Sequence, residues 1–162
     1  MQSQAGRTVS KRARRGKVGV GSNGLGTRPY DFEIFARMDP LEQRRTIREG
    51  MGAVIVVRVS TELLHLTVPK LLEYIGLPYR AILRKVERGG RLSADESDRI
   101  ARVLFVLKQA TEVFESPDLA AEWMSRDNAM LGGLKPLEAL DSQPGYDRVR
   151  MLLLRVIYGV VA

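Results

Sequence analysis

A single short stretch, residues 53–59 (AVIVVRV), decides the fold class, because it is the one run rich enough in β-branched residues to form a strand. No second run of comparable quality stands elsewhere in the sequence. A lone strand would leave its backbone N–H and C=O groups without a partner. We therefore expect residues 52–65 to be helical in spite of their local preference, and the whole chain to be all-α.

The residue types that carry most enzyme chemistry are scarce. The sequence has no cysteine and one histidine, His65, which excludes disulfides, thiolate metal sites and cages of several imidazoles. Asp95, Glu96 and Asp98 could pair, but all three fall in the first turn of one expected helix, where capping and the helix dipole already explain them. We expect no enzyme activity, no metal and no small-molecule cofactor, and assign His65 and the single tryptophan, Trp123, to structure.

Nothing in the sequence points to a membrane or to secretion. No run approaches the roughly 20 apolar residues needed to cross a bilayer. The basic N-terminus is not followed by the apolar stretch of a secretory signal. We expect a soluble, cytoplasmic protein.

The net charge of +7 is concentrated in residues 1–28, which hold seven basic residues and no acidic one. This segment is rich in Gly, Ser and Arg and has too few large apolar side chains to offset the conformational entropy lost on ordering. We therefore expect a disordered basic arm. A non-specific grip on phosphates and a solubilising tail or vector remnant both fit it. Residues 19–24 (GVGSNG) match a dinucleotide-binding fingerprint, but no strand precedes them and no helix follows, so we interpret them as linker.

Start and stop signals divide the rest of the chain into helices. Asp39 and Pro40 begin one that lasts until Gly50. Ser93 and Glu96 form a capping box, which predicts a helix running towards Phe114 with a core stripe. Further helices are expected after Ser116-Pro117, around Pro136, and from near Gly145 to Gly159, the last with a stripe of Val149, Leu152, Leu153 and Val156.

Residues 67–88 form the most informative pattern. Thr67 and Pro69 can open a first helix, residues 76–78 (GLP) break it, and a second helix is expected from about Pro78 to Arg88. Arginines then recur at intervals of four, four and three, which would put them on one helix face: Arg80, Arg84, Arg88 and Arg91. Two short helices joined by a glycine turn are typical of a helix-turn-helix.

The basic stripe has two interpretations, a solvated helix face and a DNA contact. A merely soluble face usually mixes acids with bases, whereas only Glu87 interrupts this one. Residues 66–92 together hold six basic residues against two acidic ones. We therefore predict DNA contact through the stripe, with Lys85 beside it on the phosphates.

Four motifs in order resemble the MbcA/ParS/Xre family of antitoxins, the partners of RES-domain toxins, over about residues 40–162. They are residues 92–100 (LSADESDRI), residues 120–124 (AAEWM), residues 131–137 (LGGLKPL), and Gly145 with residues 155–159 (RVIYG) at the C-terminus. No single motif is decisive, but their order and the place where they end are specific.

The resemblance implies a Xre/Cro-like helix-turn-helix module followed by a small helical toxin-binding domain. In this sequence it divides the chain into the arm (1–28), a helical N-terminal region (29–91, helix-turn-helix about 67–88) and the toxin-binding domain (92–162). The module would bind promoter DNA and autoregulate the operon. The C-terminal end would enter or cover the active site of a RES-type toxin that acts on NAD, through Tyr158, Gly159, Val160, Val161 and Ala162.

A homodimer is expected, because palindromic operators match two-fold symmetric proteins. The rival hypothesis is a stand-alone helix-turn-helix transcriptional regulator without a toxin partner, in which the C-terminal helices only dimerise.

Overall fold

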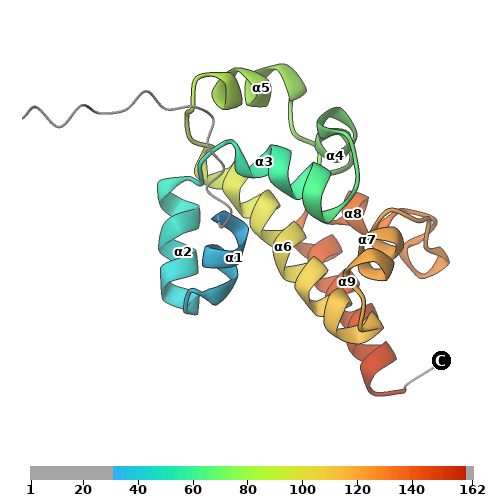
Figure 1. Cartoon of the computed structure of the whole chain (residues 1–162). Helices are drawn as coiled ribbons and strands as arrows, with labels where there is room; N and C mark the ends of the chain where they lie inside the picture. The colour runs from blue at the N-terminus through green and yellow to red at the C-terminus, as the bar shows by residue number, and fades with distance from the viewer. Residues whose placement is uncertain (1–30, 160–162) are drawn as a thin grey trace, which may run out of the picture.

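The computed structural model describes residues 31–159, and within that range every regular element is helical (Figure 1). The only β-type pairing found there is an isolated bridge between Gly52 and Arg91. The expectation of an all-α fold is confirmed. The basic arm of residues 1–28, with its GVGSNG stretch, lies outside the described residues.

The helices in chain order are α1 (Asp31–Arg37), α2 (Pro40–Glu49), α3 (Ile55–Arg58), η1 (Val59–Leu63, a π-helix), α4 (Val68–Tyr74), α5 (Tyr79–Glu87), α6 (Ala94–Phe114), α7 (Pro117–Met124), η2 (Ala129–Leu131, a 3₁₀-helix), α8 (Pro136–Ala139) and α9 (Gln143–Ile157). None of these helices has both the length and the apolar character that a bilayer crossing requires.

The β-branched run is helical, as predicted, and it forms α3 and η1. Val56 and Val59 are fully buried, so burial outweighs their strand preference. The run ends in a π turn, where Leu64 N–H donates to the Val59 carbonyl at 3.1 Å. His65 follows with φ +54°, a left-handed conformation that turns the chain towards α4.

Capping side chains fix where the two best-signalled helices begin. The Asp39 carboxylate accepts from the backbone N–H groups of Leu41 at 2.8 Å and Glu42 at 3.0 Å, and the Glu42 carboxylate accepts from Asp39 N–H at 3.2 Å. The predicted box at α6 is also present, with Ser93 N–H donating to Glu96 Oε2 at 2.7 Å and Glu96 N–H donating to Ser93 Oγ at 3.2 Å. Each box satisfies amides that the first turn leaves unpaired.

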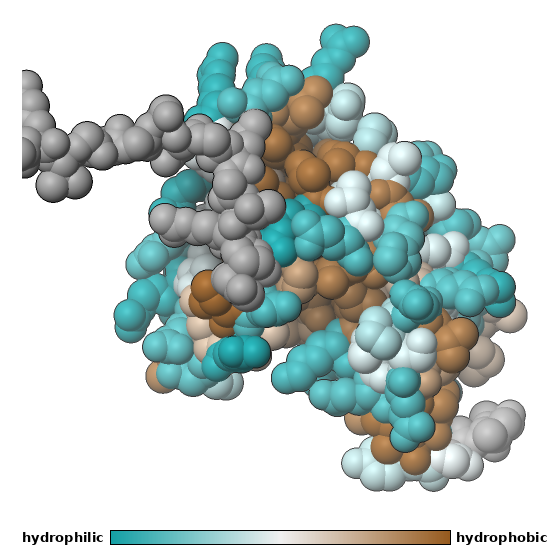
Figure 2. Space-filling model, in the orientation of Figure 1, coloured by the Kyte–Doolittle hydropathy of each residue, from teal (hydrophilic) through white to brown (hydrophobic). Residues whose placement is uncertain are grey.

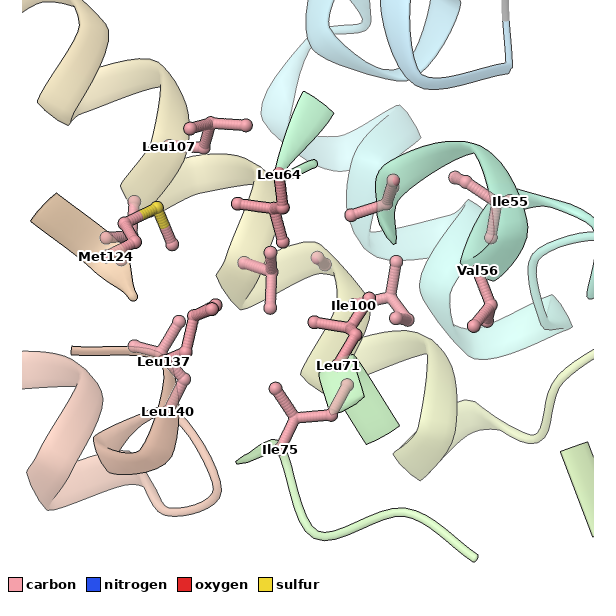
Figure 3. Close-up of a cluster of buried hydrophobic side chains, with 14 of the residues drawn as sticks. Ile55, Val56, Leu64, Leu71, Ile75, Ile100, Leu107, Met124, Leu137 and Leu140 are labelled. Atoms are coloured by element: carbon pink, nitrogen blue, oxygen red, sulfur yellow. The ribbon is translucent and has the colours of Figure 1, made fainter. Parts of the chain in front are cut away.

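The long helix α6 runs through the middle of the molecule, between α1 and α2 on one side and α7 and α9 on the other (Figure 1). One continuous hydrophobic core surrounds it. Figure 3 shows side chains from α3 and α4 meeting those from α6, α7 and α8 in this core. The helix-turn-helix and the C-terminal helices therefore share their packing.

Two elements differ from the expectation. Helix α1 was not predicted; Phe35 anchors it, buried with its ring centroid 5.6 Å from that of Phe105. In α9 the stripe is shorter than predicted, because Val149, Leu152 and Leu153 are buried while Val156 is exposed. The last turn of α9 therefore extends beyond the core.

Candidate functional site

Helices α4 and α5 form the predicted helix-turn-helix around Gly76. Gly76 has φ +67°, a region that favours glycine, and Leu77 N–H donates to the Leu72 carbonyl at 2.9 Å to close the turn. The inner faces of both helices are fully buried, with Leu71, Leu72, Ile75 and Ile82 at zero exposure. The turn is thus set by backbone geometry and by the core together.

An arginine from α6 holds this turn from behind. Arg99 Nη1 donates to the carbonyl oxygens of Ile75 at 3.0 Å and Gly76 at 2.7 Å. These carbonyls lie at the C-terminal end of α4, where the helix dipole favours a cation. Sequence reasoning missed this contact, because no local signal links residues 23 positions apart.

The arginine stripe of α5 is shorter than the spacing predicted. Arg80 and Arg84 are exposed on α5, and Arg88 is its exposed C-terminal capping residue. Helix α5 ends at Glu87, so Arg91 is not on its face. Instead Arg91 Nε donates to the Gly50 carbonyl at 2.8 Å. The expectation of four guanidiniums on one helix face is therefore corrected to a set of three.

Lys85 does not stand unpartnered beside the stripe. Its Nζ donates to Glu96 Oε2 at 2.5 Å, across the loop that joins α5 to α6. Partial burial alone would raise the pKa of Glu96, but the hydrogen bonds from Lys85 and from Ser93 N–H outweigh it and lower the pKa below its usual value. Lys85 therefore ties the end of the arginine-bearing helix to the α6 cap.

Hydrophobic side chains gather at the C-terminal end of α9. Val156, Ile157 and Tyr158 are 57%, 52% and 75% exposed, and Met151 lies one to two turns before them, also exposed. Figure 2 shows this hydrophobic surface at the lower end of the molecule, where α9 ends in Figure 1. Gly159 follows with φ +62°. The other expected toxin contacts, Val160, Val161 and Ala162, lie outside the described residues.

Three of the remaining candidates, His65, Asp98 and Trp123, contact other side chains within the fold. His65 Nε2 lies 3.2 Å from Asp118 Oδ1, and Asp98 forms an ion pair with Arg102 at 2.7 Å. Trp123 packs against Phe114, with ring centroids 5.8 Å apart. Between residues 31 and 159, no cluster of three or more His, Cys, Asp or Glu could hold a metal ion.

Two family models match the chain on either side of the middle of α6. Residues 42–104 match the antitoxin Xre-like helix-turn-helix domain, and residues 109–159 match the antitoxin Xre/MbcA/ParS C-terminal toxin-binding domain. The first match contains α4 and α5; the second contains α9 and its exposed end. Fold and matches together define an antitoxin that carries a DNA-binding module and a toxin-binding domain.

Similar proteins identify the family. The chain is 32% identical to the Antitoxin Xre of Pseudomonas putida over 129 residues, covering 80% of this chain and 74% of that protein. It is 36% identical to the Antitoxin Xre of Photorhabdus laumondii over 93 residues, 57% of this chain and 63% of that protein. It is 23% identical to the Prs ADP-ribosylating antitoxin of a Sphingobium species over 150 residues, 87% of this chain and 94% of that protein. The chain belongs to the MbcA/ParS/Xre antitoxin family.

Proposed function

We propose that the chain neutralises a RES-domain toxin that degrades NAD, and that it represses its own operon through the helix-turn-helix. The observation that carries the proposal is the separation of two exposed surfaces of different chemistry. Arginines are exposed on α5, and apolar side chains are exposed at the end of α9, within the matched toxin-binding domain. In this proposal residues 29–91 bind DNA and residues 92–162 bind the toxin. Both interactions would take place in the cytoplasm.

Inhibition would be steric. Tyr158 and Gly159, followed by Val160, Val161 and Ala162, would enter the toxin's cleft and exclude its substrate. Burial of exposed apolar surface such as that of Tyr158 would favour such a complex. The antitoxin would supply no chemistry of its own. The name of the Sphingobium relative refers to ADP-ribosylation, a reaction whose donor is NAD, and this supports an NAD-using partner.

DNA binding would depend on α5 as the recognition helix. Arg80, Arg84 and Arg88 are exposed there, and guanidinium groups suit both guanine edges and phosphates. Lys85 and Arg91 each donate one hydrogen bond within the fold. They would bind phosphates only through their other N–H groups. A homodimer would present two copies of α5 to a palindromic promoter site.

A stand-alone regulator is the second candidate, because the apolar end of α9 also fits a second copy of the chain. The deciding experiment is affinity purification of the tagged full chain at native expression, with mass spectrometry of stoichiometric partners. A single co-purifying protein that consumes NAD once separated supports the antitoxin proposal. Enrichment of promoter DNA without a protein partner supports the stand-alone regulator and contradicts the toxin partner.

A further inference from the structure

Helix α2 presents arginines away from the core. Its inner side is held by Gln43, whose Nε2 donates to the Phe35 carbonyl at 3.0 Å, and by Thr46 and Ile47, which are half-buried. The helical period then directs Arg45 and Arg48 outwards, and both are exposed. Neither forms an ion pair within the described part of the chain.

The acidic residues of α2 do not neutralise these arginines directly. Glu42 is engaged in the capping box with Asp39. Glu49 is exposed and lies one position after Arg48 and four after Arg45, but it forms no ion pair with either arginine in the described part of the chain. Arg45 and Arg48 therefore keep their guanidinium groups available to an anionic ligand.

The C-terminal end of α2 is fixed against the end of α5. Leu92 N–H donates to the Met51 carbonyl at 2.8 Å, and Ala53 N–H donates to the Gly90 carbonyl at 2.9 Å. Between them lie the Gly52–Arg91 bridge and the bond from Arg91 Nε to the Gly50 carbonyl.

The approach of the two segments depends on Gly50. Its φ is +89°, and a Cβ there would stand 2.2 Å from the Leu92 carbonyl oxygen. Arg48 and Arg88 each precede this paired segment by two residues. The last turn of α2 is thus held in a fixed position beside the end of the recognition helix.

We propose that Arg45 and Arg48 form a second set of phosphate contacts beside α5, so that the DNA footprint extends beyond α4 and α5. This inference rests on the proposed DNA binding. Contacts of this kind fix the orientation of the protein on the duplex without reading bases, and arginine suits them through its fork of donors. DNA is favoured over an acidic protein surface because the segment paired with α2 belongs to the basic region of residues 66–92.

The test measures binding of the full chain to two duplexes by fluorescence anisotropy over a series of salt concentrations. One duplex carries the region upstream of the chain's own gene, and the other is an unrelated sequence of equal length. The variants are Arg45→Ala with Arg48→Ala, the charge-preserving Arg45→Lys with Arg48→Lys, and Arg148→Ala with Arg150→Ala as a control of equal charge on α9. Arg84→Ala with Arg88→Ala reports on α5 in the same assay.

We expect the α2 alanine pair to weaken binding about 10-fold on both duplexes and to lower the salt slope by about 2, since each lost phosphate contact removes about 0.9. The lysine pair keeps the slope, and the α9 pair leaves both quantities at the parental value. An α2 alanine pair that behaves like the α9 control, while the α5 pair still loses affinity, overturns this inference alone. No binding of either duplex by the parent overturns the DNA function together with it.

Discussion

Arg99 in α6 and Gly76 in the helix-turn-helix are joined by a 2.7 Å hydrogen bond from the Arg99 guanidinium to the Gly76 carbonyl oxygen. A Cβ at position 76 would stand 3.0 Å from the same Arg99 nitrogen. The turn between α4 and α5 therefore leaves little room for a side chain and is tied to the helix behind it. The position of the recognition helix depends on this contact as well as on the core.

Gly76→Ala should lower the free energy of unfolding by about 2 kcal/mol, because the new methyl group meets Arg99 and alanine is strained at positive φ by about 1 kcal/mol. Gly132→Ala is the matched control, since Gly132 has φ +69° and no atom within 4 Å of its built Cβ. Gly132→Ala should lose only the about 1 kcal/mol that comes from backbone strain. Urea denaturation followed by circular dichroism measures the free energy of unfolding of both variants. Equal losses at the two positions would contradict the predicted contact between the new methyl group and Arg99.

Arg99→Ala should cost about 1.5–3 kcal/mol, since two backbone carbonyls lose a charged donor. In that background Gly76→Ala should become as mild as Gly132→Ala, because the atom it meets is gone. The double-mutant cycle gives this coupling directly. Additive losses would show that Gly76 and Arg99 act independently.

Glu96→Gln should flatten the acid limb of the stability profile. The pKa of Glu96 is lowered in the folded chain, so the unfolded chain binds more protons as the pH falls below about 4.5, and stability is lost through the folded pKa. The parent should lose stability more steeply than Glu96→Gln between about pH 5 and pH 3. Glu112→Gln removes one carboxylate at an exposed position of the same helix and is the matched control. Parallel profiles for the parent and Glu96→Gln would contradict the expectation.

Arg84→Ala with Arg88→Ala should weaken promoter binding and reduce its salt slope by about 2. Both side chains are exposed, so the fold should be unchanged, which the melting temperature checks. The α9 pair Arg148→Ala with Arg150→Ala removes the same charge elsewhere and serves as the control. Parental affinity and slope in the α5 pair would remove α5 as the reading helix.

Val160→Asp with Val161→Asp should leave DNA binding intact and weaken toxin inhibition by at least about 100-fold, because two carboxylates would have to be buried in the toxin's cleft. Leu41→Asp is a control, since Leu41 is exposed and lies outside the matched toxin-binding domain. Inhibition is measured as residual NAD consumption by the toxin at increasing antitoxin concentration. Unchanged inhibition by the aspartate pair would reject the plugging mechanism.

Signals that act over one turn of helix were sufficient to predict much of the fold. The box of Ser93 and Glu96, the start at Asp39 and the glycine turn at Gly76 depend on neighbouring residues, and each is found where it was expected. The helical state of residues 52–65 was predicted from an absence, since no second strand could pair with the β-branched run, and α3 and η1 form within that range. Helix α1 was missed because a seven-residue helix has little stability of its own, and Phe35 gains its packing from Phe105, 70 residues away.

The candidate site was harder to predict from the sequence, because its contacts also join residues that are far apart in the chain. The spacing of the arginines predicted that Arg91 lies on the same face as the α5 arginines, but Gly89 at φ +62° turns the chain after Arg88. The partners of Lys85 and Arg91, which are Glu96 and the Gly50 carbonyl, lie 11 and 41 residues away. The roles assigned to the basic residues and to the C-terminal tip stay predictions.

The two matched regions meet inside α6, with the first ending at residue 104 and the second beginning at residue 109 of one uninterrupted helix. A rigid helix transmits rotation, and each residue adds about 100° of turn and 1.5 Å of rise. Inserting or deleting one residue at this seam would swing the apolar end of α9 around the axis of α6 relative to α5 and break the common core. A chimera that joins two family members within α6 should therefore contain no insertion or deletion at the junction. Only such exchanges should keep the α5 arginines and the apolar end of α9 in their native relative orientation.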